Sequence, residues 1–133
     1  MLTAVRKAIL VLALAIVSSS AMAEWIEVGS NETDTLYVDL STRREKGNLA
    51  KMWALNDFKA IQRLEDREPF MSEKTEYEHD CEGAQSRLLY LTSYTKPMAA
   101  GEVVGYNLAP GEWMQFPPES ALDILWRIAC GKV

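Results

Sequence analysis

Two cysteines, Cys81 and Cys130, constrain the fold of this chain more than any other feature of its sequence. Two cysteines in an exported protein most economically form one disulfide, because oxidising compartments favour the bond. Such a bond would enclose about 50 residues, and the loop-entropy model assigns about 4 kcal/mol of stability to a loop of that length. The sequence therefore predicts a covalent link between the middle of the chain and its C-terminal segment.

A reactive or metal-bound thiol is the alternative role for these cysteines. The sequence has no Cys-x-x-Cys spacing, and it has only one histidine, His79, whereas a typical zinc site needs more histidine or cysteine ligands than this chain offers. We therefore expect a structural disulfide.

The first 23 residues have the pattern of a secretory signal peptide. Arg6 and Lys7 supply a positive start, residues 8–17 are uninterruptedly apolar, and residues 18–23 end in an Ala-x-Ala cleavage site at Ala23. The apolar run is shorter than the roughly 20 residues that a membrane-spanning helix needs. No cysteine near the cleavage site offers a lipid attachment point. We expect an exported protein, periplasmic or secreted, with no membrane anchor after cleavage.

Removal of the signal makes the chain more acidic. The full sequence has 14 basic and 19 acidic residues, and losing Arg6 and Lys7 leaves 12 against 19, a net charge of about −7. Nucleic acid and anionic lipid both require a net positive face, so neither is expected as a primary partner. Residues 24–133 are enough for one domain with one core.

The apolar pattern predicts an α+β fold, in which strands are followed by one helix. Alternation indicates about five to six strands, at residues 25–28, 35–40, 48–58, 71–81, 86–95 and 102–108. The strand at 48–58 has apolar residues on both faces, so both faces must be at least partly covered. A bulge is expected at Gly105.

The C-terminal segment changes to a helical period. Residues 119–130 place Leu122, Leu125, Trp126 and Ala129 on one stripe, and two prolines precede the segment. So wide an apolar stripe must lie on the sheet.

Two charged segments interrupt the strand pattern. Residues 41–47 read as a long solvated turn that closes on Gly47, and residues 59–70 read as a long loop with room for a helical turn. Loops are the better choice for partner contacts, since the strands are needed for the fold. The candidate contact residues are Arg43, Arg44, Lys46, Arg63 and Arg67.

The run His79-Asp80-Cys81 resembles the components of a catalytic triad, but strand geometry argues against one. Adjacent strand residues point to opposite faces, and an oxidised cysteine cannot act as a nucleophile. A lone histidine at a strand end is expected to be partly exposed, with an axial haem ligand as the alternative. The acidic residues at 73–82 lack the spacing of a calcium loop. We therefore predict no catalytic residues, no metal and no cofactor.

Five aromatic residues fit a core better than a cofactor site. They are Trp53, Tyr77, Tyr90, Trp113 and Trp126.

A set of short motifs, taken in order, resembles the surface-adhesin protein E family of Gram-negative bacteria. The motifs span the predicted mature chain: Tyr37-Val38-Asp39, Ser41, Gly47, Met52-Trp53-x-Leu55, Ser72, Glu78-x-Asp80-Cys81, Arg87, Gly101-Glu-Val-Val104, Pro117-Pro118 and Cys130. The resemblance implies an antiparallel sheet with a C-terminal helix packed on it and one disulfide. It also implies attachment to host-surface or extracellular-matrix components and admits a homodimer.

These observations favour an exported binding domain with a protein partner. The founding adhesin of the family resembles a lipoprotein, whereas this chain has no lipid-acceptor cysteine, so surface display needs separate support. The alternative is a periplasmic structural or accessory protein.

Overall fold

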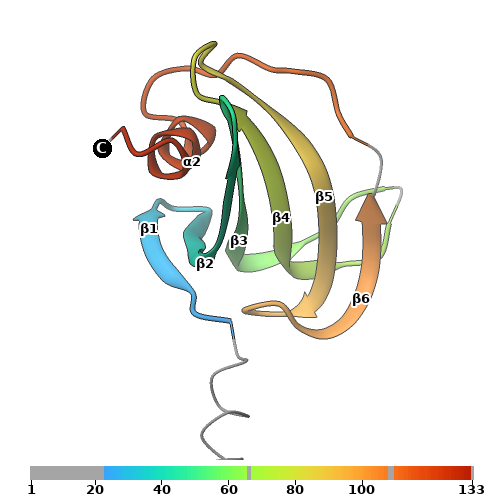
Figure 1. Ribbon diagram of the computed structural model, residues 1–133. Coiled ribbons are helices and arrows are strands. Elements are labelled where there is room, and N and C mark those ends of the chain that lie inside the picture. The colour runs from blue at the N-terminus through green and yellow to red at the C-terminus, as the bar shows by residue number, and fades with distance from the viewer. Residues whose placement is uncertain (1–22, 66, 108–109, 133) are drawn as a thin grey trace, which may run out of the picture.

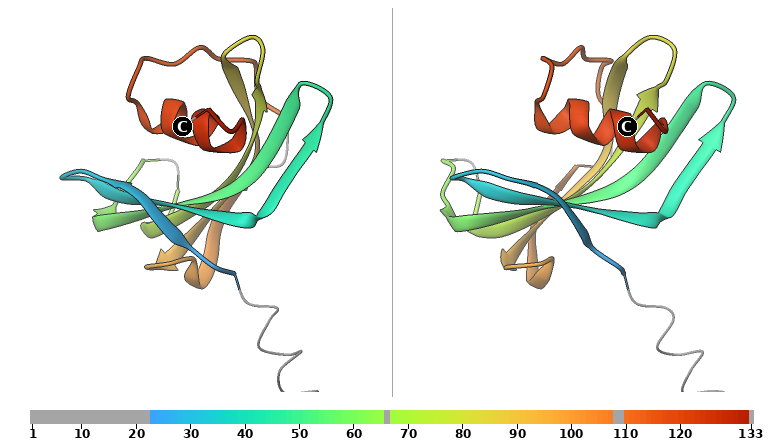
Figure 2. Two further views of the ribbon diagram at one scale, coloured as in Figure 1. Left: turned by 60° about the vertical axis from the view of Figure 1, so that its left-hand side comes forward. Right: turned by 90° about the vertical axis from the view of Figure 1, so that its left-hand side faces the viewer.

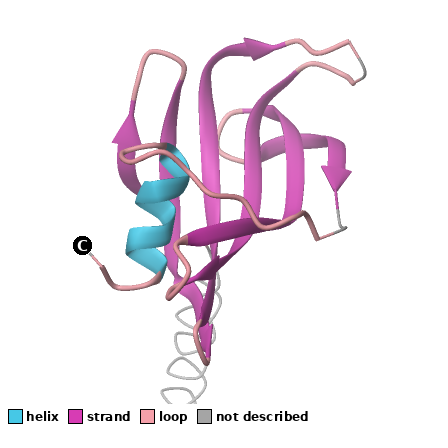
Figure 3. Cartoon of the chain, turned by 90° about the horizontal axis from the view of Figure 1, so that it is seen from above, coloured by secondary structure: helices cyan, strands magenta, loops and turns pink. Residues whose placement is uncertain are grey.

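The computed structural model describes residues 23–65, 67–107 and 110–132, so the predicted signal peptide lies outside the described residues except for Ala23. The described part forms one antiparallel sheet whose six strands follow in chain order, and one helix, α2 (Figures 1 and 3). The elements are β1 (Ile26–Ser30), β2 (Asp34–Lys46), β3 (Leu49–Gln62), β4 (Phe70–Asp80), β5 (Gln85–Lys96), β6 (Ala100–Asn107) and α2 (Ala121–Ala129). The predicted fold class is confirmed.

The sheet is strongly curved, and α2 packs against one of its faces (Figure 2). We call this the inner face. Small and branched side chains of β2 and β3 meet the apolar stripe of α2 there, in a core formed by Leu36, Val38, Ala50, Met52, Ala54, Leu125 and Ala129. Residues that alternate with these project from the opposite side, which we call the outer face.

Both faces of β3 are covered, as its sequence predicts. Met52 is 1% exposed on the inner face, and Leu55 is 0% exposed on the outer face. Strand β4 is also buried on both sides, since Ser72 and Glu76 on one face and Thr75 and His79 on the other are all buried. Neither face of β4 is therefore fully open to solvent.

The expected long turn at residues 41–47 is wrong, because β2 continues through this segment to Lys46. The register of β2 against β3 shifts between Asp39 and Arg44. Within the shift, the Asp39 carboxylate accepts hydrogen bonds from the backbone and hydroxyl of Ser41. The Thr42 hydroxyl accepts a bond from the Trp53 backbone N–H at 3.0 Å. Side chains thus replace the interrupted ladder, and the strand resumes beyond the bulge.

The second charged segment is also shorter than expected. Strand β3 extends to Gln62, and the connection to β4 contains no helix in its described residues. The bulge expected at Gly105 is confirmed, since the register of β5 against β6 shifts between Ser93, which pairs with Gly105, and Tyr94.

Candidate functional site

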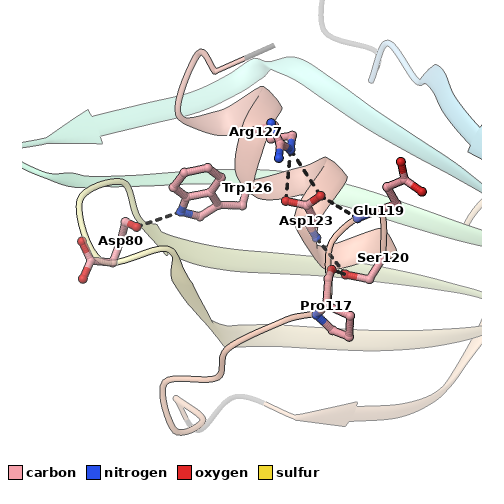
Figure 4. A network of polar contacts seen from close by, with 7 residues as sticks. All are labelled: Asp80, Pro117, Glu119, Ser120, Asp123, Trp126 and Arg127. Atoms are coloured by element: carbon pink, nitrogen blue, oxygen red, sulfur yellow. Dashed lines mark hydrogen bonds and ion pairs between the residues drawn. The ribbon is translucent and has the colours of Figure 1, made fainter.

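The disulfide between Cys81 and Cys130 joins the end of β4 to the end of α2, as the sequence predicts, with a Cα–Cα distance of 5.5 Å. A hydrogen bond reinforces this link, because the Trp126 indole Nε1 donates to the backbone oxygen of Asp80 at 2.7 Å (Figure 4). One covalent and one polar contact therefore attach α2 to the same β4–β5 turn.

The N-terminus of α2 is fixed by its own polar network (Figure 4). Ser120 caps the helix and accepts a hydrogen bond from the Asp123 backbone N–H at 3.2 Å. The Asp123 carboxylate accepts bonds from the Glu119 backbone N–H and from Arg127. These donors, the Glu119 N–H first, hold the pKa of Asp123 below its usual value. Asp123 is thus a structural anion at the positive end of the helix.

Arg43, the first candidate contact residue, is turned toward α2. Its Nε donates to the backbone oxygen of Ala129 at 2.6 Å, and its Nη2 forms an ion pair with Glu45 at 3.2 Å. A cation at the last turn satisfies a free carbonyl and complements the helix dipole. The structure thus gives Arg43 a role in holding the helix.

His79 is buried, and the expectation of partial exposure is wrong. Its side chain is 1% exposed on the inner face, where Nδ1 lies 2.7 Å from the Ser86 hydroxyl. Its Nε2 has no hydrogen-bond partner among the described residues. Burial lowers the pKa of His79 from 6.5 to about 4, so the ring is neutral at physiological pH. Ser86 of the neighbouring strand β5 pairs with His79, and the sequence alone does not reveal that register.

The neighbours of His79 do not join it in a catalytic group. The Asp80 carboxylate accepts bonds from the backbone of Glu82 and Gly83 and from the Gln85 amide, and these donors, Gly83 first, lower its pKa. Cys81 is oxidised. Among the described residues, no group of three His, Cys, Asp or Glu side chains is placed to hold a metal ion.

The outer face carries an aromatic pair that the sequence analysis assigned to a core. Trp53 of β3 and Tyr90 of β5 both pair with Glu76 of β4, one from each side, and their rings stack with centroids 5.9 Å apart. The Lys74 ammonium lies 4.7 Å from the Trp53 ring centroid. Tyr90 is 40% exposed, so the pair forms part of the molecular surface.

Glu76 lies between the two strands that carry these rings and is 6% exposed. Its burial raises the pKa of the carboxyl group, although the positive charges of Lys51 and Lys74 act in the opposite direction.

A second aromatic contact lies beside the first on the outer face. The Arg87 guanidinium lies 4.8 Å from the Trp113 ring centroid and forms an ion pair with Glu78 at 2.7 Å. Of the aromatic residues expected in the core, Trp126 and Tyr77 do pack there, whereas Trp53, Tyr90 and Trp113 cover the outer side. Alternation gives the two faces of a strand but does not tell which face receives the helix.

The β2–β3 hairpin contains a pocket of about 270 Å³, which we call the basic pocket. Two candidate contact residues, Arg44 and Lys46, line it together with Lys51, which the sequence analysis placed in a strand and did not select. The other lining residues are Glu45, Leu49, Ala50 and Glu78. The register accounts for the cluster, because Arg44 lies directly opposite Lys51 and Lys51 directly opposite Glu78.

The remaining candidates, Arg63 and Arg67, lie at the other end of β3. Arg63 is exposed. Arg67 stacks 4.7 Å from the Phe70 ring centroid and donates to the Ser93 hydroxyl at 3.1 Å, so much of its side chain holds the loop to the sheet. The structure therefore does not unite the five candidates in one site.

The described part of the chain includes no helix with the length and apolar character needed to cross a membrane.

Comparisons with known proteins point to one group. No curated protein sequence matches the chain. Its fold is similar to that of Haemophilus influenzae protein E in crystal form II, with a TM-score of 0.64 and 11% sequence identity over 84% of this chain and 90% of that one. Protein E from non-typeable Haemophilus influenzae gives a TM-score of 0.57 and 12% identity, over 84% of this chain and 78% of that one. These likenesses concern the fold alone.

The sequence model described as surface-adhesin protein E matches residues 25–131, which include every strand, the helix and both cysteines. The chain therefore belongs to the surface-adhesin protein E family.

Proposed function

We propose that this protein is an exported, non-enzymatic binding domain of the adhesin type. Its partner is a protein component of a host surface or of the extracellular matrix. The observation that carries the proposal is membership of the surface-adhesin protein E family over residues 25–131.

The geometry of the outer face supports a binding role. A stacked Trp53–Tyr90 pair, the Lys74 ammonium and the basic pocket all lie on the side of the sheet that α2 leaves uncovered. Tryptophan, tyrosine and arginine are the residue types enriched where proteins bind one another. We also propose that the protein can form a homodimer, as the family resemblance admits.

A periplasmic structural or accessory role is the competing function, because the sequence near the predicted cleavage site has no lipid-acceptor cysteine. The location of the protein in the cell distinguishes the surface binding role from the periplasmic role. We expect antibody labelling of intact cells, and a signal that external protease removes, once the full-length chain is exported. If osmotic shock releases all of the protein and intact cells show none, the binding role at a surface loses its basis.

A further inference from the structure

The basic pocket carries positive charge that its own acidic residues do not neutralise. Its lining includes three cations, Arg44, Lys46 and Lys51, and two carboxylates. Both carboxylates already have arginine partners outside the pocket, because Glu45 pairs with Arg43 at 3.2 Å and Glu78 with Arg87 at 2.7 Å. Among the described residues, none of the three cations forms an ion pair with a carboxylate.

Two of these cations face each other across the hairpin. Arg44 and Lys51 are direct partners across β2 and β3, where like charges repel, while Glu78 lies opposite Lys51 on its other side. An anion between Arg44 and Lys51 would be attracted by both charges. An unfavourable pair of this kind at the rim of a pocket is the arrangement expected of a site that binds an anion.

The Arg44 side chain is held in place before any ligand arrives. Its Nη1 donates to the backbone oxygens of Ser41 and Arg43, at 3.1 and 2.8 Å. A guanidinium also carries donors on Nη2 and Nε, so a fixed Nη1 leaves further N–H groups for recognition. Fixing the side chain in advance reduces the entropy lost on binding.

The composition of the pocket indicates the kind of anion. Arginine binds carboxylate and phosphate-type oxyanions through paired hydrogen bonds, and lysine adds a point charge that phosphate sites also use. One arginine and two lysines around one pocket therefore fit a tetrahedral oxyanion such as sulfate or phosphate. Competition with a polycarboxylate tests the carboxylate alternative. Membrane recognition uses clusters of about four to eight basic residues, more than this pocket has, and the protein as a whole is acidic.

The surroundings indicate that the anion is part of a polymer. The hairpin that holds the pocket projects from one end of the sheet (Figure 2). From Lys51 the outer face continues across Glu78 to Arg87 and Trp113, and along the strands to Trp53 and Lys74. A chain with negative groups at intervals and sugar rings between them would find the cations Lys51 and Lys74 beside the Trp53 ring along β3 and β4. It would find the Trp113 ring beside Arg87, which is already paired with Glu78. The rest of the protein is acidic and repels an anionic polymer, whereas the cations of the basic pocket attract it. The two effects together orient the polymer toward the pocket.

We propose that the basic pocket binds a sulfate group of a sulfated polysaccharide, with the polymer continuing over Arg87, Trp113 and Trp53. The choice of sulfate over phosphate rests on the proposed function, since matrix proteins carry sulfated polysaccharide chains.

The test measures binding of heparin oligosaccharides, as the sulfated probe, to the purified protein after export of the full-length chain. The main variant is Lys46→Ser combined with Lys51→Ser, both at exposed positions. The matched control is Lys59→Ser combined with Lys96→Ser, which removes the same number of positive charges at exposed positions outside the pocket. We expect the pocket variant to bind at least tenfold more weakly and to show a smaller salt dependence. The control should bind within twofold of the unaltered protein.

Thermal unfolding provides a second readout of binding. Heparin should raise the melting temperature of the unaltered protein more than that of the pocket variant. Retained melting behaviour also shows that the variants are folded.

Several results would overturn the inference. If the pocket variant binds heparin as well as the unaltered protein, or if the control loses as much binding, heparin is held by general charge attraction and not by the pocket. Equal competition by inorganic phosphate, by phosphatidylglycerol vesicles or by polyglutamate would assign the pocket to another anion. If the pocket variant keeps its surface location and matrix attachment but heparin never binds, the pocket inference fails and the proposed function stands. If heparin binds as expected but the protein never reaches the surface, the proposed function fails instead.

Discussion

His79 gives this domain a sensitivity to mild acid. Its imidazole is buried, and its only polar contact among the described residues is Ser86, so burial lowers its pKa from 6.5 to about 4. In the unfolded chain the ring takes up a proton near pH 6.5, whereas in the folded chain it stays neutral until about pH 4. The unfolded state therefore binds more protons in this window, and stability falls as the pH falls through it.

We predict a loss of about 3 kcal/mol in unfolding free energy between pH 6.5 and 4, measured by urea denaturation. The sequence has a single histidine, so its NMR signals can be followed without ambiguity. They should report a neutral ring down to about pH 4 in the folded protein. His79→Gln should flatten the pH dependence above pH 4. A folded-state pKa near the ordinary value would contradict the account.

Asp123 and Asp80 act in a lower pH range. Backbone and side-chain donors lower the pKa of both carboxylates, so each stabilises the fold above the ordinary aspartate pKa and loses that effect only as the pH falls further. The loss caused by His79 therefore begins at a higher pH than the loss caused by these aspartates.

Glu76 is the opposite case, a carboxylate whose burial costs stability at neutral pH. Since burial raises its pKa, the folded state favours the protonated form. We predict that Glu76→Gln raises the unfolding free energy at pH 7 by up to about 1 kcal/mol. Glu78→Gln is the matched control, because it breaks the Arg87 ion pair and should not stabilise. A destabilised Glu76→Gln protein would mean that attraction to Lys51 and Lys74 outweighs burial.

The surroundings of His79 and of Glu76 could not be predicted from the sequence. The pattern places His79 at the end of a strand but does not reveal that Ser86 of β5 lies beside it. It places Glu76 in a run of acidic residues but does not show that Trp53 and Tyr90 lie beside it on the two neighbouring strands. Such burial depends on register, which alternation within one strand does not specify.

At the level of elements, α2 depends on its attachments. The helix has nine residues, too few for stability in isolation, and it is held by the disulfide, by the Trp126 indole and by Arg43. These contacts act at its C-terminal half, while the Ser120 and Asp123 network orders its start.

We predict that replacing both Cys81 and Cys130 with serine lowers the unfolding free energy by about 2–4 kcal/mol. Hydrogen exchange should then accelerate most in α2, while amides in the centre of β3 and β4 stay protected in the folded state. Trp126→Phe should give a smaller change in the same region, and Trp113→Phe, on the outer face, should not affect the helix. Equal acceleration across the sheet would show that α2 is not a separately attached element.

Strand and helix types were predictable because their periods are clear. The end of β2 was not, because the charged run after Leu40 has the composition of a turn. The strand continues there because the Thr42 hydroxyl accepts the Trp53 backbone N–H of β3, and because Ser41 bonds to Asp39 within the bulge. Composition does not express such contacts. Gly47, with a φ of 59°, provides the turn that the sequence placed at that position.

For the whole molecule, the cysteines and the periodic segments were sufficient to predict the fold class. The candidate site was predicted only in part. Arg44 and Lys46 were selected as a loop cluster and instead line a pocket on paired strands, where Lys51 joins them. Arg43 holds the helix, and Arg67 packs on Phe70. A charged residue in a sequence does not indicate whether its partner is solvent, a carbonyl group or a ring.

The most direct test of the binding role is a binding isotherm of the purified, oxidised protein on a surface coated with extracellular matrix. The account predicts saturable binding that unlabelled protein displaces and that disappears after reduction and unfolding. An unrelated exported domain of equal size and charge should not bind. Attachment no greater than that of the unrelated domain, across the whole concentration range, would contradict the proposed function.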